Sequence, residues 1–139
     1  MIILSVDYGK ARTGIAVCDK NEMLASPEQV ITEYHADRLA EKVVQIAKNK
    51  QAEMIVLGLP KNMDGSEGES AQNVRLFAKM LEERSAVPVV LWDERLSTVT
   101  AHEYLNMTNT RGKKRKAVVD SVAAVIILED YLRFRRNGL

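Results

Sequence analysis

Four acidic residues stand where the sequence changes from an apolar run to a turn or a helix. Asp7 follows an apolar run at the N-terminus, Asp93 and Glu94 follow a second one, and Asp120 opens the last helical pattern. Carboxylate oxygens are the preferred protein ligands of Mg²⁺ and Mn²⁺. Phosphodiester hydrolysis commonly uses such acids to hold one or two metal ions that activate water. Metal-assisted hydrolysis is therefore the chemistry that these acids would support if the fold brings them together.

Each acid also has a purely structural interpretation. An Asp at the start of a helix is often a cap or a turn former, and this applies above all to Asp120. Asp93 or Glu94 could instead form an ion pair with Arg95. Because adjacent residues of a strand point to opposite faces, at most one of these two acids is expected to face the same side as Asp7, and we favour Glu94.

The elements that must position these acids follow from the hydrophobic pattern. Two β-type runs joined by a Gly-containing turn, and a third run with Pro27 as the sign of an edge or a bulge, cover residues 2–7, 13–18 and 23–31. Helical spacing of apolar residues covers 36–50, 69–83 and 118–135. Continuous apolar runs, typical of buried parallel strands, cover 54–58 and 87–92. A further short helix is expected from a cap at Ser97 or Thr98 to Tyr104.

A meander of three strands followed by alternating helices and strands predicts an α/β layered domain. The first strand and the two later strands should be parallel neighbours. Ligand sites in such sheets lie at the carboxyl ends of the strands, which is where Asp7, Asp93 and Glu94 fall. We expect one domain over residues 1–139 and leave open whether it is a monomer or a homodimer.

Charge is unevenly distributed although the 139-residue chain carries a formal net charge of only +1. Residues 111–139 hold eight basic and three acidic side chains, so they carry the excess positive charge. We expect residues 106–116 to form a basic loop, because they lack apolar periodicity. The lone Cys18 excludes an internal disulfide, and no apolar run is long enough to cross a membrane, so we expect a cytoplasmic protein.

The sequence resembles the bacterial YqgF proteins over essentially the whole chain. These are described as Holliday-junction-resolvase-like proteins or as pre-16S rRNA nucleases of the ribonuclease-H-like superfamily. The resemblance rests on four motifs in the family's order and spacing, which are residues 7–14, 58–65, 93–98 and the basic segment followed by 119–124. Tyr8 and Ser121 depart from the residues common in the family, and neither departure touches the acids.

The resemblance implies a ribonuclease-H-like fold with a five-stranded mixed sheet whose first three strands are antiparallel, flanked by helices. It also implies catalytic and metal-holding roles for Asp7, Glu94 and Asp120, with Mg²⁺ or Mn²⁺ as cofactor. Resolvases of this superfamily usually take one acid from the fourth strand. Here that strand ends in Gly58-Leu59-Pro60, so the third ligand is expected from the fifth strand.

Other residues suit a nucleic-acid partner. Basic side chains neutralise phosphates without regard to sequence, and a helix N-terminus is a ready anion site. The candidates for nucleic-acid binding are Arg12, Thr13, Asn62, Arg95, Ser97, Thr98, Arg111, Lys113, Lys114, Arg115 and Lys116. Most of them have a plainer use: the basic segment as solvated surface, Asn62 in loop structure, Ser97 and Thr98 as helix caps, and Arg95 in steadying Glu94.

The leading hypothesis is a metal-dependent nuclease of structured RNA, with processing of the 5′ end of pre-16S rRNA in ribosome biogenesis as the role that the resemblance implies. Cleavage of branched DNA at a Holliday junction is the rival within the same class. A third alternative is a non-catalytic RNA- or ribosome-binding factor. Phosphotransfer, suggested by the likeness of residues 7–14 to the phosphate loop of actin-like kinases, would need a second lobe that 139 residues do not supply.

Overall fold

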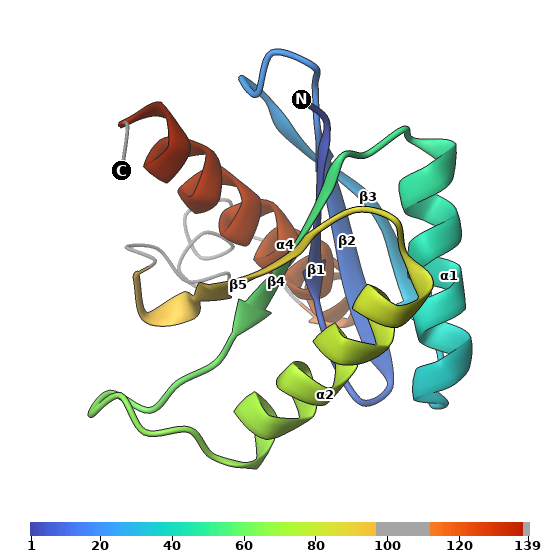
Figure 1. Ribbon diagram of the computed structural model, residues 1–139. Helices are drawn as coiled ribbons and strands as arrows, with labels where there is room; N and C mark the ends of the chain where they lie inside the picture. The colour runs from blue at the N-terminus through green and yellow to red at the C-terminus, as the bar shows by residue number, and fades with distance from the viewer. Residues whose placement is uncertain (97–111, 138–139) are drawn as a thin grey trace.

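The structure, a computed structural model, describes residues 1–96 and 112–137, with side chains placed for 1–95 and 121–137. Figure 1 shows the elements along the chain. In chain order they are β1 (Ile3–Asp7), β2 (Arg12–Cys18), β3 (Ala25–Thr32), α1 (Ala36–Asn49), β4 (Met54–Leu59), α2 (Glu69–Arg84), β5 (Val89–Asp93), the 3₁₀ turn η1 (Glu94–Leu96) and α4 (Gly112–Arg136). No helix within the described residues is long and apolar enough to span a membrane.

The five strands form one mixed sheet in the order β3-β2-β1-β4-β5. β1 pairs antiparallel with β2, and β2 pairs antiparallel with β3. β4 lies parallel to β1, and β5 lies parallel to β4. The predicted meander followed by parallel strands is therefore confirmed, and the carboxyl ends of β1, β4 and β5 share one edge.

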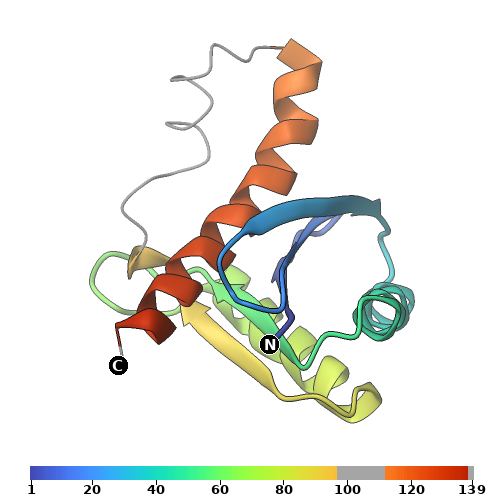
Figure 2. The ribbon, with the colours of Figure 1, turned by 90° about the horizontal axis from the view of Figure 1, so that it is seen from above.

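Each face of the sheet is covered by helices (Figure 2). α1 and α2 cover one face, where residues such as Val6 and Leu57 pack against Leu39 and Phe77 in a continuous apolar core. α4 covers the other face, where Ala124 and neighbouring apolar side chains of the helix meet those of the strands. Burial of two apolar layers against one sheet supplies the main driving force for this arrangement.

The turn from β1 to β2 depends on Gly9. A β-carbon at Gly9 would lie 2.2 Å from the carbonyl oxygen of Arg12, so no other residue fits without a change of backbone. The amide of Gly9 donates to the hydroxyl of Thr13 at 3.3 Å, which closes the turn. Tyr8 stacks on Phe77 of α2 with ring centroids 4.6 Å apart. The turn after Asp7 is thus fixed by the hydrogen bond to Thr13 and by the stacking of Tyr8 on α2.

Two sequence-based expectations about the elements differ from the structure. The predicted basic loop is wrong for residues 112–116, which form the first turns of α4. Lys, Arg and Ala have high helix propensity, which a test for apolar periodicity does not register. The last strand begins at Val89 rather than at Val87, since Pro88 cannot donate to a ladder. The predicted helix 97–104 and residues 106–111 lie outside the described residues.

The prediction of an edge or bulge at Pro27 is confirmed. β3 is an edge strand, and its register with β2 shifts where Ile15 faces Gln29 but Ala16 faces Pro27. The residue between them on β3 is left without a partner on β2. This arrangement lets the strand accommodate a proline, which has no amide proton for the ladder.

Candidate active site at the carboxyl ends of β1, β4 and β5

Asp7 ends β1 on the face of the sheet that α4 covers. Side chains alternate along a strand, and Ser5, two residues earlier, donates its hydroxyl to the carbonyl oxygen of Ala124 in α4 at 2.7 Å. The register of β1 with β4 pairs Val6 with Leu57, so Asp7 comes next to Gly58. Neighbouring strands lie about 4.8 Å apart. The half-buried carboxylate of Asp7 therefore stands beside a position that carries no side chain.

The carboxylate of Glu94 occupies the space over Gly58. A β-carbon at Gly58 would lie 3.1 Å from both Cδ and Oε1 of Glu94, and 2.6 Å from Cδ1 of Ile127 in α4. Glu94 thus reaches from the end of β5 across β4, on the face that α4 covers. Asp7 and Glu94 flank the same glycine from the two neighbouring strands.

Asp93 and Glu94 have opposite electrostatic surroundings. Burial, and secondarily the charge of Asp93, raise the pKa of the Glu94 carboxyl above its ordinary value. The hydrogen bonds from Arg95 lower the pKa of Asp93. Within the described part of the chain no hydrogen bond or ion pair reaches the Glu94 carboxylate, whereas Asp93 is fully engaged by Arg95. The two acids therefore differ in their surroundings, and the role of Glu94 as a metal ligand stays a prediction.

The backbone of Asp120 is carried toward the same edge by α4. Asp120 lies one helical turn before Ala124, which is bonded to Ser5 of β1. The hydroxyl of Tyr131, near the other end of α4, donates to the sulfur of Met54 at the start of β4. α4 therefore runs from the carboxyl ends of the strands to their amino ends. The side chain of Asp120 lies outside the described part of the chain, so its role as a ligand stays a prediction.

The described residues fit a hard divalent cation in part. Asp7 and Glu94 offer oxygen ligands of the kind that Mg²⁺ and Mn²⁺ select, and the absence of a side chain at Gly58 lets the Glu94 carboxylate lie over β4 beside the end of β1. Among side chains that the structure describes, no three acidic, His or Cys groups are close enough to share one metal ion. Asp120 is not among those side chains, so a third ligand from α4 is still a prediction.

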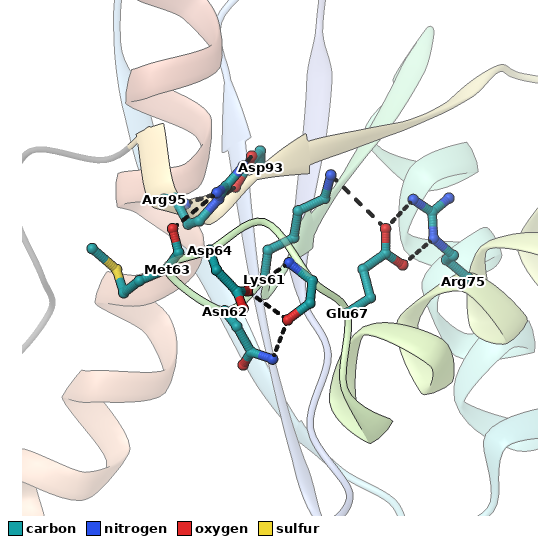
Figure 3. A network of polar contacts seen from close by, with 9 residues as sticks. Lys61, Asn62, Met63, Asp64, Glu67, Arg75, Asp93 and Arg95 are labelled. Atoms are coloured by element: carbon teal, nitrogen blue, oxygen red, sulfur yellow. Dashed lines mark hydrogen bonds and ion pairs between the residues drawn. The ribbon is translucent and has the colours of Figure 1, made fainter.

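The loop of residues 60–68, which joins β4 to α2, borders the site and is held by its own hydrogen bonds (Figure 3). The amide of Asn62 donates to the carbonyl oxygen of Ser66, and its side chain donates to the Ser66 hydroxyl, both at 2.9 Å. Asp64 accepts from the amide and the hydroxyl of Ser66 at 2.9 and 2.6 Å. Gly65 has φ +89°, a conformation that favours glycine. Asn62 therefore contributes to the structure of the loop, and its role in nucleic-acid binding stays a prediction.

The far end of this loop is tied to α2. Arg75 donates to both carboxylate oxygens of Glu67, with Nη2 2.7 Å from Oε2. Lys61, at the near end, lies 3.8 Å from the same carboxylate. Figure 3 shows these contacts on the side of the loop opposite to Arg95. The loop is thus anchored at both ends.

The other predicted binding residues are distributed as follows. Arg12 is exposed at the start of β2, close to the carboxyl end of β1. Thr13 is fully buried, and its hydroxyl also donates to the carbonyl oxygen of Gly9 at 3.4 Å, so its observed role is to support the turn. Backbone alone is described for Lys113, Lys114, Arg115 and Lys116, in the first turns of α4. Ser97, Thr98 and Arg111 lie outside the described residues.

The residue whose role sequence reasoning missed is Gly58. The sequence indicates a motif glycine at a strand end without an acid, whereas the structure shows that its missing side chain makes room for Glu94. A glycine inside a buried strand signals close approach of another group, which was the available clue. That the approaching group is the Glu94 carboxylate depends on the path of the chain after β5, so the residues around Gly58 do not reveal it.

Known proteins match the chain over nearly its whole length. A protein-family profile described as "RuvX: Holliday junction resolvase" matches residues 1–134. A protein of Halothermothrix orenii, named "Putative pre-16S rRNA nuclease", is 42% identical over 137 residues, which cover 99% of this chain and 98% of the relative. A protein of Paracoccus denitrificans with the same name is 44% identical and covers 95% of this chain and 85% of the relative.

Solved structures match the fold. RuvC of Thermus thermophilus, solved in complex with a Holliday junction substrate, superposes with a TM-score of 0.68 at 15% sequence identity, over 99% of this chain and 96% of that chain. The fowlpox virus Holliday junction resolvase gives a TM-score of 0.52 at 16% identity, over 96% and 99% of the two chains. The predicted ribonuclease-H-like fold is confirmed. From the profile and the relatives together, the chain belongs to the RuvX family.

Proposed function

We propose that this protein is a metal-dependent nuclease that cleaves phosphodiester bonds in structured nucleic acid, with precursor 16S rRNA as its substrate. The observation that carries the proposal is the placement of the Glu94 carboxylate over Gly58, next to Asp7. One acid ends β1, the other follows β5, and both lie beside Gly58 at the sheet edge where ligands of α/β proteins bind. The choice of substrate is supported by the names of the relatives, which cover nearly the whole chain.

The proposed roles follow from this placement. Asp7 at the end of β1 and Glu94 in the turn after β5 hold Mg²⁺ or Mn²⁺ from either side of β4, and Asp120 supplies a third carboxylate from α4. A bound divalent cation would supply the positive charge that activates water and stabilises the leaving oxygen of a phosphodiester. Arg12 and the basic residues at the start of α4 hold the phosphate backbone, a contribution that is independent of sequence.

The test is cleavage of a structured 16S rRNA precursor and of a four-way DNA junction, each with Mg²⁺, with Mn²⁺ and with chelator. We expect metal-dependent cleavage of the RNA that Asp7→Asn and Glu94→Gln abolish while RNA binding persists, because both changes remove charge and keep shape. Cleavage of the junction alone would favour the DNA resolvase that the family description names. Binding of either nucleic acid without cleavage would favour a non-catalytic factor.

A further inference from the structure

Arg95 makes a two-pronged contact with Asp93, and the two residues stand on either side of Glu94 in the sequence. Its Nε lies 3.2 Å from each carboxylate oxygen of Asp93, and its Nη2 lies 2.8 Å from Oδ2. The amide of Arg95 also donates to Oδ1 at 2.9 Å. The residues on either side of Glu94 are therefore bonded to each other through side chain and backbone, which fixes the path of the chain from β5 into η1.

The same guanidinium holds the 60–68 loop against this corner. Nη1 of Arg95 donates to the carbonyl oxygen of Met63 at 3.4 Å, and a β-carbon at Gly65 would lie 3.4 Å from the same nitrogen. Figure 3 shows Arg95 between the end of β5 and the tip of the loop. One side chain thus joins the segment that carries Glu94 to the loop that borders the site.

These contacts leave Arg95 poorly suited to bind a phosphate. All three of its side-chain nitrogens already have acceptors in the protein, and Asp93 neutralises its charge at short range. The planar guanidinium of an arginine forms two directed hydrogen bonds to a carboxylate in addition to the charge attraction. The ammonium group of a lysine cannot form this forked pair. These contacts are typical of an arginine that orients the chain segments around it.

We propose that Arg95 is a positioning residue, which holds the Glu94 carboxylate over Gly58 through its pair with Asp93. It is therefore not one of the residues that bind nucleic-acid phosphates. This inference rests on the proposed function, because the group that it positions is a proposed metal ligand. It adds a role for the Asp93–Arg95 pair in assembling the site.

The experiment compares Arg95→Ala, Arg95→Lys and Asp93→Asn with Arg75→Ala. Arg75 forms the same kind of forked pair with Glu67 at the other end of the loop, so its variant is the matched control. Three quantities are measured, after melting curves have shown that each variant folds. They are the salt dependence of RNA binding without metal, the affinity for Mn²⁺ without RNA, and kcat and KM for cleavage.

If Arg95 positions Glu94, its Ala and Lys variants and Asp93→Asn should all weaken Mn²⁺ binding and lower kcat by about 10- to 100-fold, which is the usual loss when a partner of a metal ligand is removed. KM and the salt dependence of RNA binding should not change. Arg75→Ala should resemble the wild type in all three measurements. Asp93→Asn is the sharpest variant, because it breaks the pair but keeps the positive charge of Arg95.

If Arg95 instead binds a phosphate, Arg95→Ala should lower the slope of log affinity against log salt by about one, Arg95→Lys should restore it, and Asp93→Asn should leave kcat unchanged. That set of results would overturn the inference while leaving the proposed function intact. A wild-type protein that neither binds Mn²⁺ nor cleaves would overturn the proposed function and this inference with it.

Discussion

The carboxylate of Glu94 lies over Gly58, at a place that a single β-carbon would fill. That β-carbon would come within 3.1 Å of Oε1 of Glu94 and within 2.6 Å of Cδ1 of Ile127. The end of β4 therefore contributes to the site by what it lacks. The glycine at the end of β4 makes the space that the acid following β5 occupies.

Gly58→Ala should displace Glu94 and disable the site while the fold survives. The added methyl group must move the end of Ile127, 2.6 Å away, and push the Glu94 carboxylate by a few tenths of an ångström. Overpacking of this kind costs about 1 to 3 kcal/mol of unfolding free energy. We expect at least a tenfold loss of kcat. Gly68→Ala is the control, because nothing lies within 4 Å of a β-carbon there. Cleavage by Gly58→Ala at the wild-type rate would show that Glu94 does not need this space.

The sheet could be predicted from the sequence because its signals are local and repeated. Alternating or continuous apolar runs marked β1, β4 and β5, and the handedness and pairing rules then left few topologies. The helix boundaries of α1 and α2 came within a residue or so for the same reason. α4 was predicted too short, because its first turns are basic and carry no apolar stripe.

The site was predictable only at the level of which residues end the strands. Alternation along the chain favoured Glu94 over Asp93, and their different surroundings agree with that preference. What could not be predicted is that Arg95 is shared between Asp93 and the carbonyl oxygen of Met63, because that contact joins segments 32 residues apart. The hydrogen bonds within the 60–68 loop depend in the same way on three-dimensional structure.

Glu94→Gln should stabilise the metal-free protein at neutral pH while it abolishes cleavage. Burial raises the pKa of this carboxyl in the folded state, so the ionised form destabilises the fold above that pKa. Removing the charge should raise the unfolding free energy at pH 7 by an amount on the order of 1 kcal/mol. The difference should vanish below about pH 4, the ordinary pKa of Glu, where both proteins are neutral at this position. Melting curves recorded with chelator from pH 7 to pH 3.5 would measure it.

Ser5→Ala should loosen the contact between β1 and α4. The hydroxyl of Ser5 is fully buried and donates to Ala124 at 2.7 Å, so its loss should cost about 1 kcal/mol. Because α4 carries Asp120, we also expect cleavage to fall severalfold. Urea unfolding and cleavage assays would test this, with the exposed Ser70→Ala on α2 as control. If Ser5→Ala and Ser70→Ala changed stability and cleavage equally, Ser5 would have no special role in positioning the site.

Protonation of Glu22 should lower the unfolding free energy of the protein as the pH falls from about 4.5 to 2. Its hydrogen bonds from Arg135, 2.6 Å from Nε to Oε1, lower its pKa to about 2. A lowered pKa means that the pair contributes fully above the ordinary pKa of Glu and is lost as the pH falls through the folded value. Glu22→Gln should cost about 1 kcal/mol at pH 7, since the pair is partly exposed, and this cost should shrink as the pH falls to 2, where Glu22 of the folded protein is partly protonated. The measurement is the unfolding free energy against pH for the wild type and for Glu22→Gln. Parallel curves over this range would contradict the lowered pKa of Glu22.

Neutralising the four basic residues Lys113 to Lys116 should weaken RNA binding without regard to sequence. α4 covers the face of the sheet on which Asp7 and Glu94 lie and runs from the carboxyl ends of the strands to their amino ends, so its first turns are on the same side of the sheet as the proposed site rather than in the opposite layer. Each lost phosphate contact should lower the slope of log affinity against log salt by about 0.7 to 0.9. The control replaces Lys42 and Lys48 of α1, which packs on the other face, and should leave the slope unchanged. An unchanged slope in the α4 variant would make this basic segment solvated surface and leave Arg12 as the remaining described candidate for holding the backbone.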